Sequence, residues 1–249
     1  MSVRMKKELI EGGMQLRAAP QQFAVEAEAA LPGGLRDEVR LFYTEAQAEP
    51  AQAEAVGNRL TVSGRVNFRA LYAQGDLTRV RCAEGSGDFS RVLTITPGEG
   101  SAAYTPHCEI TSATARVFNG RLLLRAEMNV TAQADAARQV NAVTQVEEDG
   151  AQVLSQTLEL QQCVGGGESS GLIRGEFELA PALQVEEALL AGADARVEDI
   201  IGGADGRATV TGTIDLTVCH ASRMPGRPLV YTQHSMPFEQ TVTLSGEMG

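Results

Sequence analysis

The sequence predicts an all-β protein made of two tandem, antiparallel, sandwich-like domains. Three observations predict it: apolar and polar residues alternate with period two, tight-turn dipeptides separate the alternating stretches, and one strand pattern occurs twice. The length of 249 residues suits one large domain or two small ones. We assign the first domain to residues 1–135 and the second to residues 136–249.

The repeat relates residues 59–73, RLTVSGRVNFRALYA, to residues 207–221, RATVTGTIDLTVCHA. Gly64 and Gly212 lie 148 positions apart, and a block led by Phe89 recurs at Phe238 with an offset of 149. A period this long indicates two copies of one domain, because solenoid repeats are about 20 to 50 residues long. We expect the shared structural core to contain Gly64, Phe68, Tyr72, Phe89, Gly212, Leu216 and Phe238.

Each repeated strand has one apolar face and one polar face, which is typical of an antiparallel sheet with a solvated side. Gly64 and Gly212 interrupt the apolar faces in mid-strand. Glycine weakens a strand unless the strand bends or another group packs closely above it. We therefore expect a bulge or a sharp coil at both glycines.

Turn dipeptides mark the hairpins. Gly57-Asn58 and Asp205-Gly206 precede the repeated strands, Asn119-Gly120 separates ATARVF from RLLLRAEMNV, and Asp149-Gly150 predicts a turn between residues 140–146 and 153–160. These dipeptides tolerate the positive φ of primed turns. A two-residue loop at Asn119-Gly120 places apolar residues opposite one another in two pairs, Val117 with Leu122 and Ala115 with Leu124.

The remaining segments are assigned from weaker patterns. Alternating runs begin at Phe23 and Ile173, whereas residues 35–43 fit a helix or a strand equally well. Residues 185–190 favour a short helix, residues 132–139 an interdomain linker, and residues 165–171 a flexible loop.

Composition excludes several function classes. The net charge of −11 disfavours nucleic acid and anionic lipid as partners, and 11 aromatic residues leave few stacking platforms. Lys6 and Lys7 are the only lysines, so a lysine phosphate loop or Schiff-base chemistry has no amine in the folded region. No apolar run resembles a signal peptide or a membrane span, which predicts a cytoplasmic chain without membrane insertion. The cysteines are expected to be reduced thiols: Cys82, Cys108, Cys163 and Cys219.

One motif fits a catalytic nucleophile. Residues 167–171, GESSG, match G-x-S-x-G with Ser169 as nucleophile, and Asp194 or Asp199 and His220 or His234 follow in the expected order. The elbow requires a strand before the serine and a helix after it, but residues 172–179 alternate like a strand. We therefore interpret the motif as a flexible loop and predict no catalytic residues and no enzyme activity.

Metal and carboxylate sites are also disfavoured. His107-Cys108 and Cys219-His220 could each give one ligand to a zinc site, because neighbouring side chains on a strand point to opposite faces. Four glutamates alternate with apolar residues and are better explained as solvated strand faces than as a glycosidase pair: Glu26, Glu28, Glu176 and Glu178. We predict no metal and no cofactor.

The order of these blocks resembles the SPOCS domain. The similarity rests on TVSGRVNFRALY, a short hairpin, a Phe-led strand, and HCEITSATARVFNGRLLLRAEMNV, and it covers residues 23–134 and, as a second copy, about 153–244. SPOCS domains occur in SipL-like spore coat morphogenetic proteins of spore-forming Firmicutes, commonly in tandem. The sequence departs from the family in two respects: the Leu-Tyr pair becomes Cys219-His220 in the second copy, and no LysM module is present.

The resemblance implies a non-enzymatic protein on the mother-cell side of the forming spore. It would bind other spore coat proteins, with a SpoIVA-like coat-base ATPase as the expected kind of partner, and the missing LysM module leaves that contact open. The alternatives are a carbohydrate or cell-wall binding module, for which Tyr43, Tyr72, Tyr104 and Tyr231 are the candidates, and a hydrolase using Ser169.

The second copy stops where the first continues into the Asn119-Gly120 hairpin. An uncovered sheet invites pairing, so we expect another segment to cover the strand containing Val242 and Leu244. Residues 14–31, a following domain or a second molecule could supply it, and self-association through edge strands is one outcome.

Overall fold

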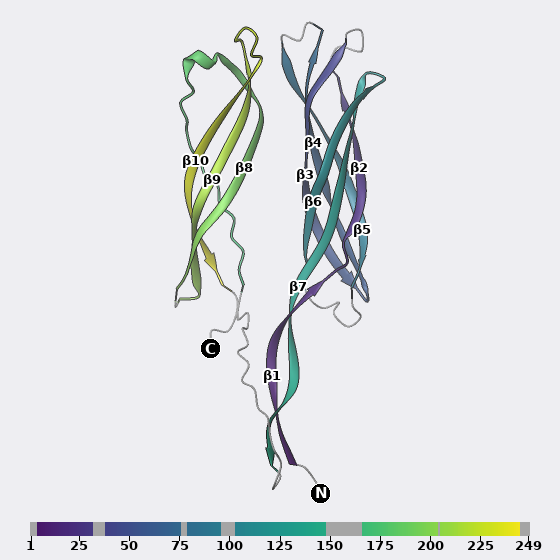
Figure 1. Cartoon of the computed structure of the whole chain (residues 1–249), viewed down its shortest axis with the longest axis vertical. Coiled ribbons are helices and arrows are strands. Elements are labelled where there is room, and N and C mark those ends of the chain that lie inside the picture. Colours follow the sequence, from purple (N-terminus) through teal and green to yellow (C-terminus); the bar gives the residue numbers. More distant parts are fainter. Residues whose placement is uncertain are drawn as a thin grey trace.

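A computed structural model describes residues 4–31, 38–75, 79–95, 103–147, 166–203 and 205–244. Almost all of this chain is antiparallel β-structure, which confirms the predicted all-β class (Figure 1). The elements in chain order are β1 (Arg4–Arg17), β2 (Gln21–Ala30), β3 (Val39–Val56), β4 (Arg59–Gln74), β5 (Val80–Thr94), β6 (Thr105–Phe118), β7 (Arg121–Glu147), the 3-10 helix η1 (Pro181–Leu183), β8 (Val185–Gly202), β9 (Arg207–Ser222) and β10 (Leu229–Thr243).

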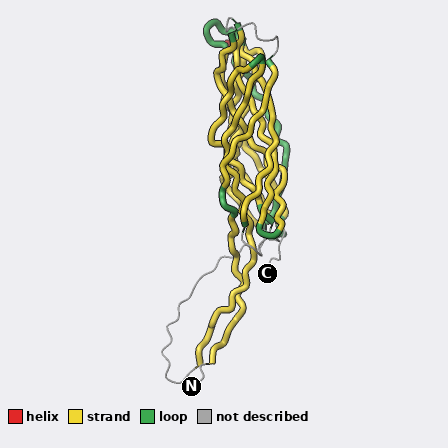
Figure 2. Tube along the Cα trace, turned by 90° about the vertical axis from the view of Figure 1, so that its right-hand side faces the viewer, coloured by secondary structure: helices red, strands yellow, loops and turns green. Residues whose placement is uncertain are grey.

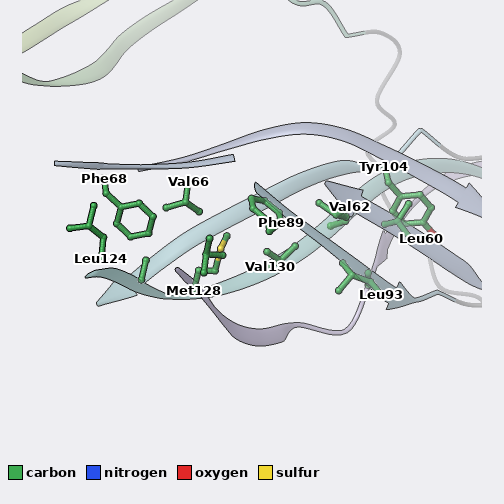
Figure 3. Packing of buried hydrophobic residues seen from close by; sticks show 14 of the residues in the cluster. Leu60, Val62, Val66, Phe68, Phe89, Leu93, Tyr104, Leu124, Met128 and Val130 are labelled. Carbon is green, nitrogen blue, oxygen red and sulfur yellow. The ribbon is translucent and has the colours of Figure 1, made fainter. Parts of the chain in front are cut away.

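The first unit is a two-sheet sandwich. One sheet has the order β3-β4-β5, and the facing sheet places β7 between β2 and β6. Their inner faces form one hydrophobic core, part of which Figure 3 shows. Its centre is closed to solvent, with exposed fractions of 1 % for Phe68 and 6 % for Phe89. Tyr72 is equally buried, at 1 %.

Strand β7 continues well beyond the sandwich. Its first half pairs with β2 and β6, Gln133 pairs with both β6 and β1, and its second half, from Ala134 to Glu147, pairs with β1 alone among the described strands. The result is a two-stranded antiparallel extension, which we call the ribbon, that projects from one end of the molecule (Figure 2). The linker predicted at residues 132–139 is therefore wrong, because these residues form part of β7 and pair with β1. The boundary drawn at residue 135 falls inside this strand.

The second unit repeats one sheet of the first. Its strand order is β10-β9-β8, and Gly212 of β9 pairs with Phe238 of β10 as Gly64 of β4 pairs with Phe89 of β5. The two glycines thus occupy the same place in the central strands of matching sheets. The repeat inferred from the sequence corresponds to a repeated three-stranded sheet.

The mid-strand glycines are explained by close packing. A Cβ atom on Gly64 would lie 2.7 Å from Cζ of Phe89, and one on Gly212 would lie 2.8 Å from Cε1 of Phe238. The neighbouring strand bulges opposite each glycine, between Pro50 and Gln52 in β3 and between Val197 and Asp199 in β8. The expected bulges are therefore present, but in the partner strands.

The turn at Asn119-Gly120 has the predicted register. Both residues have positive φ, 46° and 80°, as a primed turn requires. Val117 pairs with Leu122 and Ala115 with Leu124, as the alternation predicted. Local turn chemistry therefore fixes how β6 and β7 align.

The other expectations have mixed outcomes. The helix favoured at residues 185–190 is wrong, because these residues begin β8. The strand expected from Ile173 is also wrong, since residues 167–180 are extended but irregular. From Val39 the ambiguous segment 35–43 is strand β3, and Phe23 lies in β2 as expected. The turn at Asp149-Gly150 and residues 153–160 lie outside the described residues.

The second unit lacks the closed core of the first. Val62, Val66 and Phe68 are at most 1 % exposed, whereas their repeat counterparts are only partly buried: Val210, Ile214 and Leu216. Phe238 is likewise only partly buried. Leu216 and Phe238 therefore do not anchor a sealed core as Phe68 and Phe89 do, because no second sheet covers β8-β9-β10 in the described part of the chain.

Val62 and Val210 offer a matched test of this difference. Removing two methyl groups from fully buried Val62 should cost about 2 kcal/mol of unfolding free energy, through lost burial and a residual cavity. The same change at partly buried Val210 should cost clearly less. Denaturant unfolding of V62A and V210A measures both, and equal losses would contradict the open second unit.

Candidate binding surface

A single extended segment lies on the inner face of the second sheet. This segment, Gly166 to Ala180, which we call the strap, runs antiparallel to β10: a Cβ on Gly167 would touch Val242 and Thr243, and one on Gly175 would touch Met236. The Gln240 amide donates to Oγ of Ser169 at 2.7 Å. Phe177 stacks on His234, with ring centroids 4.0 Å apart. These contacts fix the strap over β10.

The strap takes the place that β2 has in the first unit. Strand β2 crosses β5 in the same way, with Phe23 packed against Phe89 at 5.7 Å and the Gln21 amide donating to the Val92 carbonyl at 2.8 Å. The two segments differ in the strand that pairs with them. Strand β2 pairs along its length with β7, whereas no strand pairs with residues 167–180 of the strap among the described residues.

A groove of about 870 Å³ lies beside the strap. Its floor is formed by Ile214 and Leu216 of β9 and by Ala193 of β8, and the strap contributes Ile173 and Phe177 to its wall. Ile173 is 41 % exposed and Phe177 37 %. Arg174 and Glu176 of the strap also line the groove, which is therefore a mainly apolar surface on the face that forms a core in the first unit.

In the first unit, two strands fill the position that corresponds to the groove. There β7 lies between β2 and β6, and β6 packs on β3, the counterpart of β8. The inward side chains of β7 are 0–4 % exposed over seven alternating positions: Leu122, Leu124, Ala126, Met128, Val130, Ala132 and Ala134. The groove has the position of a two-stranded hairpin with that pattern.

The outer face of the second sheet is partly occupied. Leu71, Ala73 and Val80 of the first unit pack against Leu190 and Cys219 of the second. Because neighbouring residues of a strand face opposite ways, this contact uses the side of β9 that faces away from the groove. The inner face, with Ile214 and Leu216, stays available.

Residues 14–31, one of the three candidates to cover β10, do not cover it. Residues 14–31 pair with β7 in the first unit, through the end of β1 and through β2. The strap covers Val242 instead. This role of the strap was not predicted from the sequence, although Gly167, Gly171 and Gly175 recur every four residues. A Cβ atom on each of these glycines would contact β10.

The catalytic candidates are not assembled into a triad. Ser169 bonds to Gln240, and the residues that follow it form no helix, so the context of a nucleophile elbow is missing. His220 is 6 % exposed, with Nε2 2.9 Å from Oγ1 of Thr232 and no partner for Nδ1. It occupies the position of Tyr72 in the first unit.

The thiols are not activated. Burial raises the pKa of Cys82, Cys108 and Cys219 above that of a free thiol, which is opposite to the shift of a reactive cysteine. These three are free, and Cys163 lies outside the described residues.

The other candidate groups have structural roles or lie apart. Glu26 bonds to Arg125 at 2.9 Å and Glu28 to Arg121 at 2.6 Å on the solvated face of the first unit, whereas Glu176 and Glu178 belong to the exposed strap. In the described ranges no three His, Cys, Asp or Glu side chains gather as metal ligands would.

The tyrosines do not form an exposed row. Tyr72 and Tyr104 are buried, and Tyr43 and Tyr231 are 51 % and 64 % exposed. Sugar-binding surfaces use exposed aromatic faces, and two of the four candidates lack one.

No protein-family model, curated protein or solved structure matches this chain. Among the described residues, no helix has the length and apolar character needed to cross a membrane.

His220 predicts a pH dependence of stability. Burial, followed by the nearby His234, lowers its pKa, so the folded protein keeps His220 neutral where the unfolded chain, with a pKa of about 6.5, binds a proton. Stability should therefore fall as pH decreases below about 6.5. H220F should unfold with a weaker acid dependence between pH 6.5 and 5 in denaturant titrations. An unchanged dependence in H220F would show that another group causes it.

Proposed function

We propose that this chain is a non-enzymatic assembly protein that binds other proteins by accepting β-strands into the groove of its second unit. One observation carries the proposal. The same three-stranded sheet occurs twice, and its inner face is sealed by a hairpin in the first unit, whereas in the second unit no described strand seals it.

The physical basis is β-augmentation. An added strand pairs with the backbone of strap residues 167–179, with which no described strand pairs, and its apolar side chains pack on Ile214 and Leu216. Full burial of one such side chain stabilises a complex by about 1.5 to 3 kcal/mol. The groove residues are already partly buried, so each contributes only a part of this amount, and several must act together to offset the cost of ordering the partner.

The charge of the second unit favours certain partners. Residues 166–244 contain eleven acidic and five basic side chains, a net charge of −6. A partner strand with basic flanking residues is attracted to such a surface, and an acidic one is repelled. Alternating apolar residues with basic flanks thus define the chemistry of the partner.

We further propose that the assembly is the spore coat. The support is the resemblance to SPOCS domains in the order of the sequence blocks and in their tandem arrangement. A SpoIVA-like coat-base ATPase and other coat proteins on the mother-cell side of the forming spore are then the natural partners. Recombinant ATPase of that type is the first protein to test for binding.

A synthetic hairpin tests the groove itself. A fluorescent peptide with the sequence of residues 105–134 carries the β6-β7 pattern that seals the first unit. It should bind the intact chain, and I173E should weaken binding at least about tenfold by placing a charge in the groove wall. Fluorescence anisotropy measures both affinities.

F42E provides the matched control, because Phe42 is 40 % exposed, close to the 41 % of Ile173, and does not line the groove. It should bind the peptide like the unmodified chain. No binding to the intact chain, or equal loss in the two variants, would contradict the proposed function.

A further inference from the structure

The ribbon is the second part of the molecule whose outer edges have no described neighbouring strand. It consists of β1 and the second half of β7, and in the described part of the chain these two strand segments pair only with each other. Strand β1 has 14 residues, the same number as β6, one of the two strands that seal the first unit. The molecule thus carries a free two-stranded antiparallel ribbon and a groove with the position of a two-stranded antiparallel hairpin.

The ribbon exposes apolar side chains that a solvated hairpin does not require. Met5, Leu9 and Val143 are 54 %, 56 % and 48 % exposed. Val143 pairs with Lys7, two residues from Leu9, so Leu9 and Val143 lie on one face of the ribbon. On this face Lys7 lies between Met5 and Leu9, and Asn141 lies opposite Leu9, so the apolar side chains that the groove floor can cover are Met5, Leu9 and Val143, next to polar ones.

Charge also matches the ribbon to the groove. Lys6 and Lys7, the only lysines of the chain, lie near the tip of the ribbon together with Arg4. Lys6 is 62 % exposed and pairs with Glu8 of its own strand at 3.0 Å. The ribbon residues 4–17 and 134–147 contain five basic and four acidic side chains, a net charge of +1, whereas the second unit has a net charge of −6, so the two surfaces do not repel each other.

The ribbon does not reach its own groove. It projects beyond the end of the sandwich, and its tip lies away from β8, β9 and β10 in both views (Figures 1 and 2). Its base is fixed, since Leu16 at the end of β1 is 5 % exposed in the core of the first unit. A ribbon in the groove must therefore come from another molecule.

We propose that the ribbon of one molecule inserts into the groove of a second copy, where its two strands extend the strap as β7 and β6 extend β2. This inference rests on the proposed function and names the partner as the chain itself. The two surfaces differ, so the contact is head-to-tail and repeats from copy to copy. Such contacts produce rings or open filaments.

Two variants separate the two surfaces in the full-length chain. L9E places a charge on the ribbon and leaves the groove intact, whereas I173E places one in the groove and leaves the ribbon intact. Analytical ultracentrifugation of the unmodified chain should show a mass that rises with concentration beyond a dimer. Each variant alone should remain monomeric, and an equal mixture should form a 1:1 dimer, because one intact ribbon meets one intact groove.

The controls are F118E and F42E. Phe118 is 56 % exposed like Leu9, and Phe42 is 40 % exposed. Both control variants should assemble like the unmodified chain. Formation of the mixed dimer also shows that each variant retains one folded surface.

Three results would overturn the inference: a monomeric unmodified chain, equal effects of the ribbon variant and its control, or no dimer in the mixture. If the chain stays monomeric but binds the hairpin peptide, self-assembly is wrong and the proposed function stands. If it neither assembles nor binds the peptide, both are wrong.

Discussion

The structure depends on one constraint: a β-sheet with one apolar face must have that face covered. In the first unit β7 brings seven inward apolar residues over β4, and the resulting core is closed to solvent. In the second unit the same constraint is met only in part, by a strap that lies over β10. The open groove, the exposed strap residues and the partial burial of Leu216 follow from this one difference.

Local chemistry in the sequence was sufficient to predict the repeated sheet. Alternation with period two predicted strands β4 and β9, and the Asn119-Gly120 turn predicted the register of β6 and β7. The mid-strand glycines indicated close packing, which the rings of Phe89 and Phe238 supply. Each of these features depends on neighbours in the chain or on one cross-strand partner, so a single sequence contains the information.

Features that depend on distant partners were not predicted. Residues 132–139 are rich in alanine and polar groups, like a linker, yet they form a strand because β1 lies beside them. Residues 185–190 have helical spacing but join β9 through backbone pairing. The sequence predicted a flexible loop followed by a strand for the residues of the strap. Its actual position depends on contacts with β10, which local sequence patterns do not contain. For the candidate site, the sequence indicated an uncovered second copy but not the groove that results.

Backbone hydrogen exchange tests the central claim most directly: the strap corresponds to β2, but no described strand pairs with its residues 167–180. In dilute protein, amides of β2 should be protected by their pairing with β7, and those of residues 172–180 should exchange rapidly. Adding the residue 105–134 hairpin peptide, or raising the protein concentration, should slow exchange in the strap and leave β2 unchanged. Strong protection of the strap in dilute protein, or no change when strands are supplied, would contradict the account.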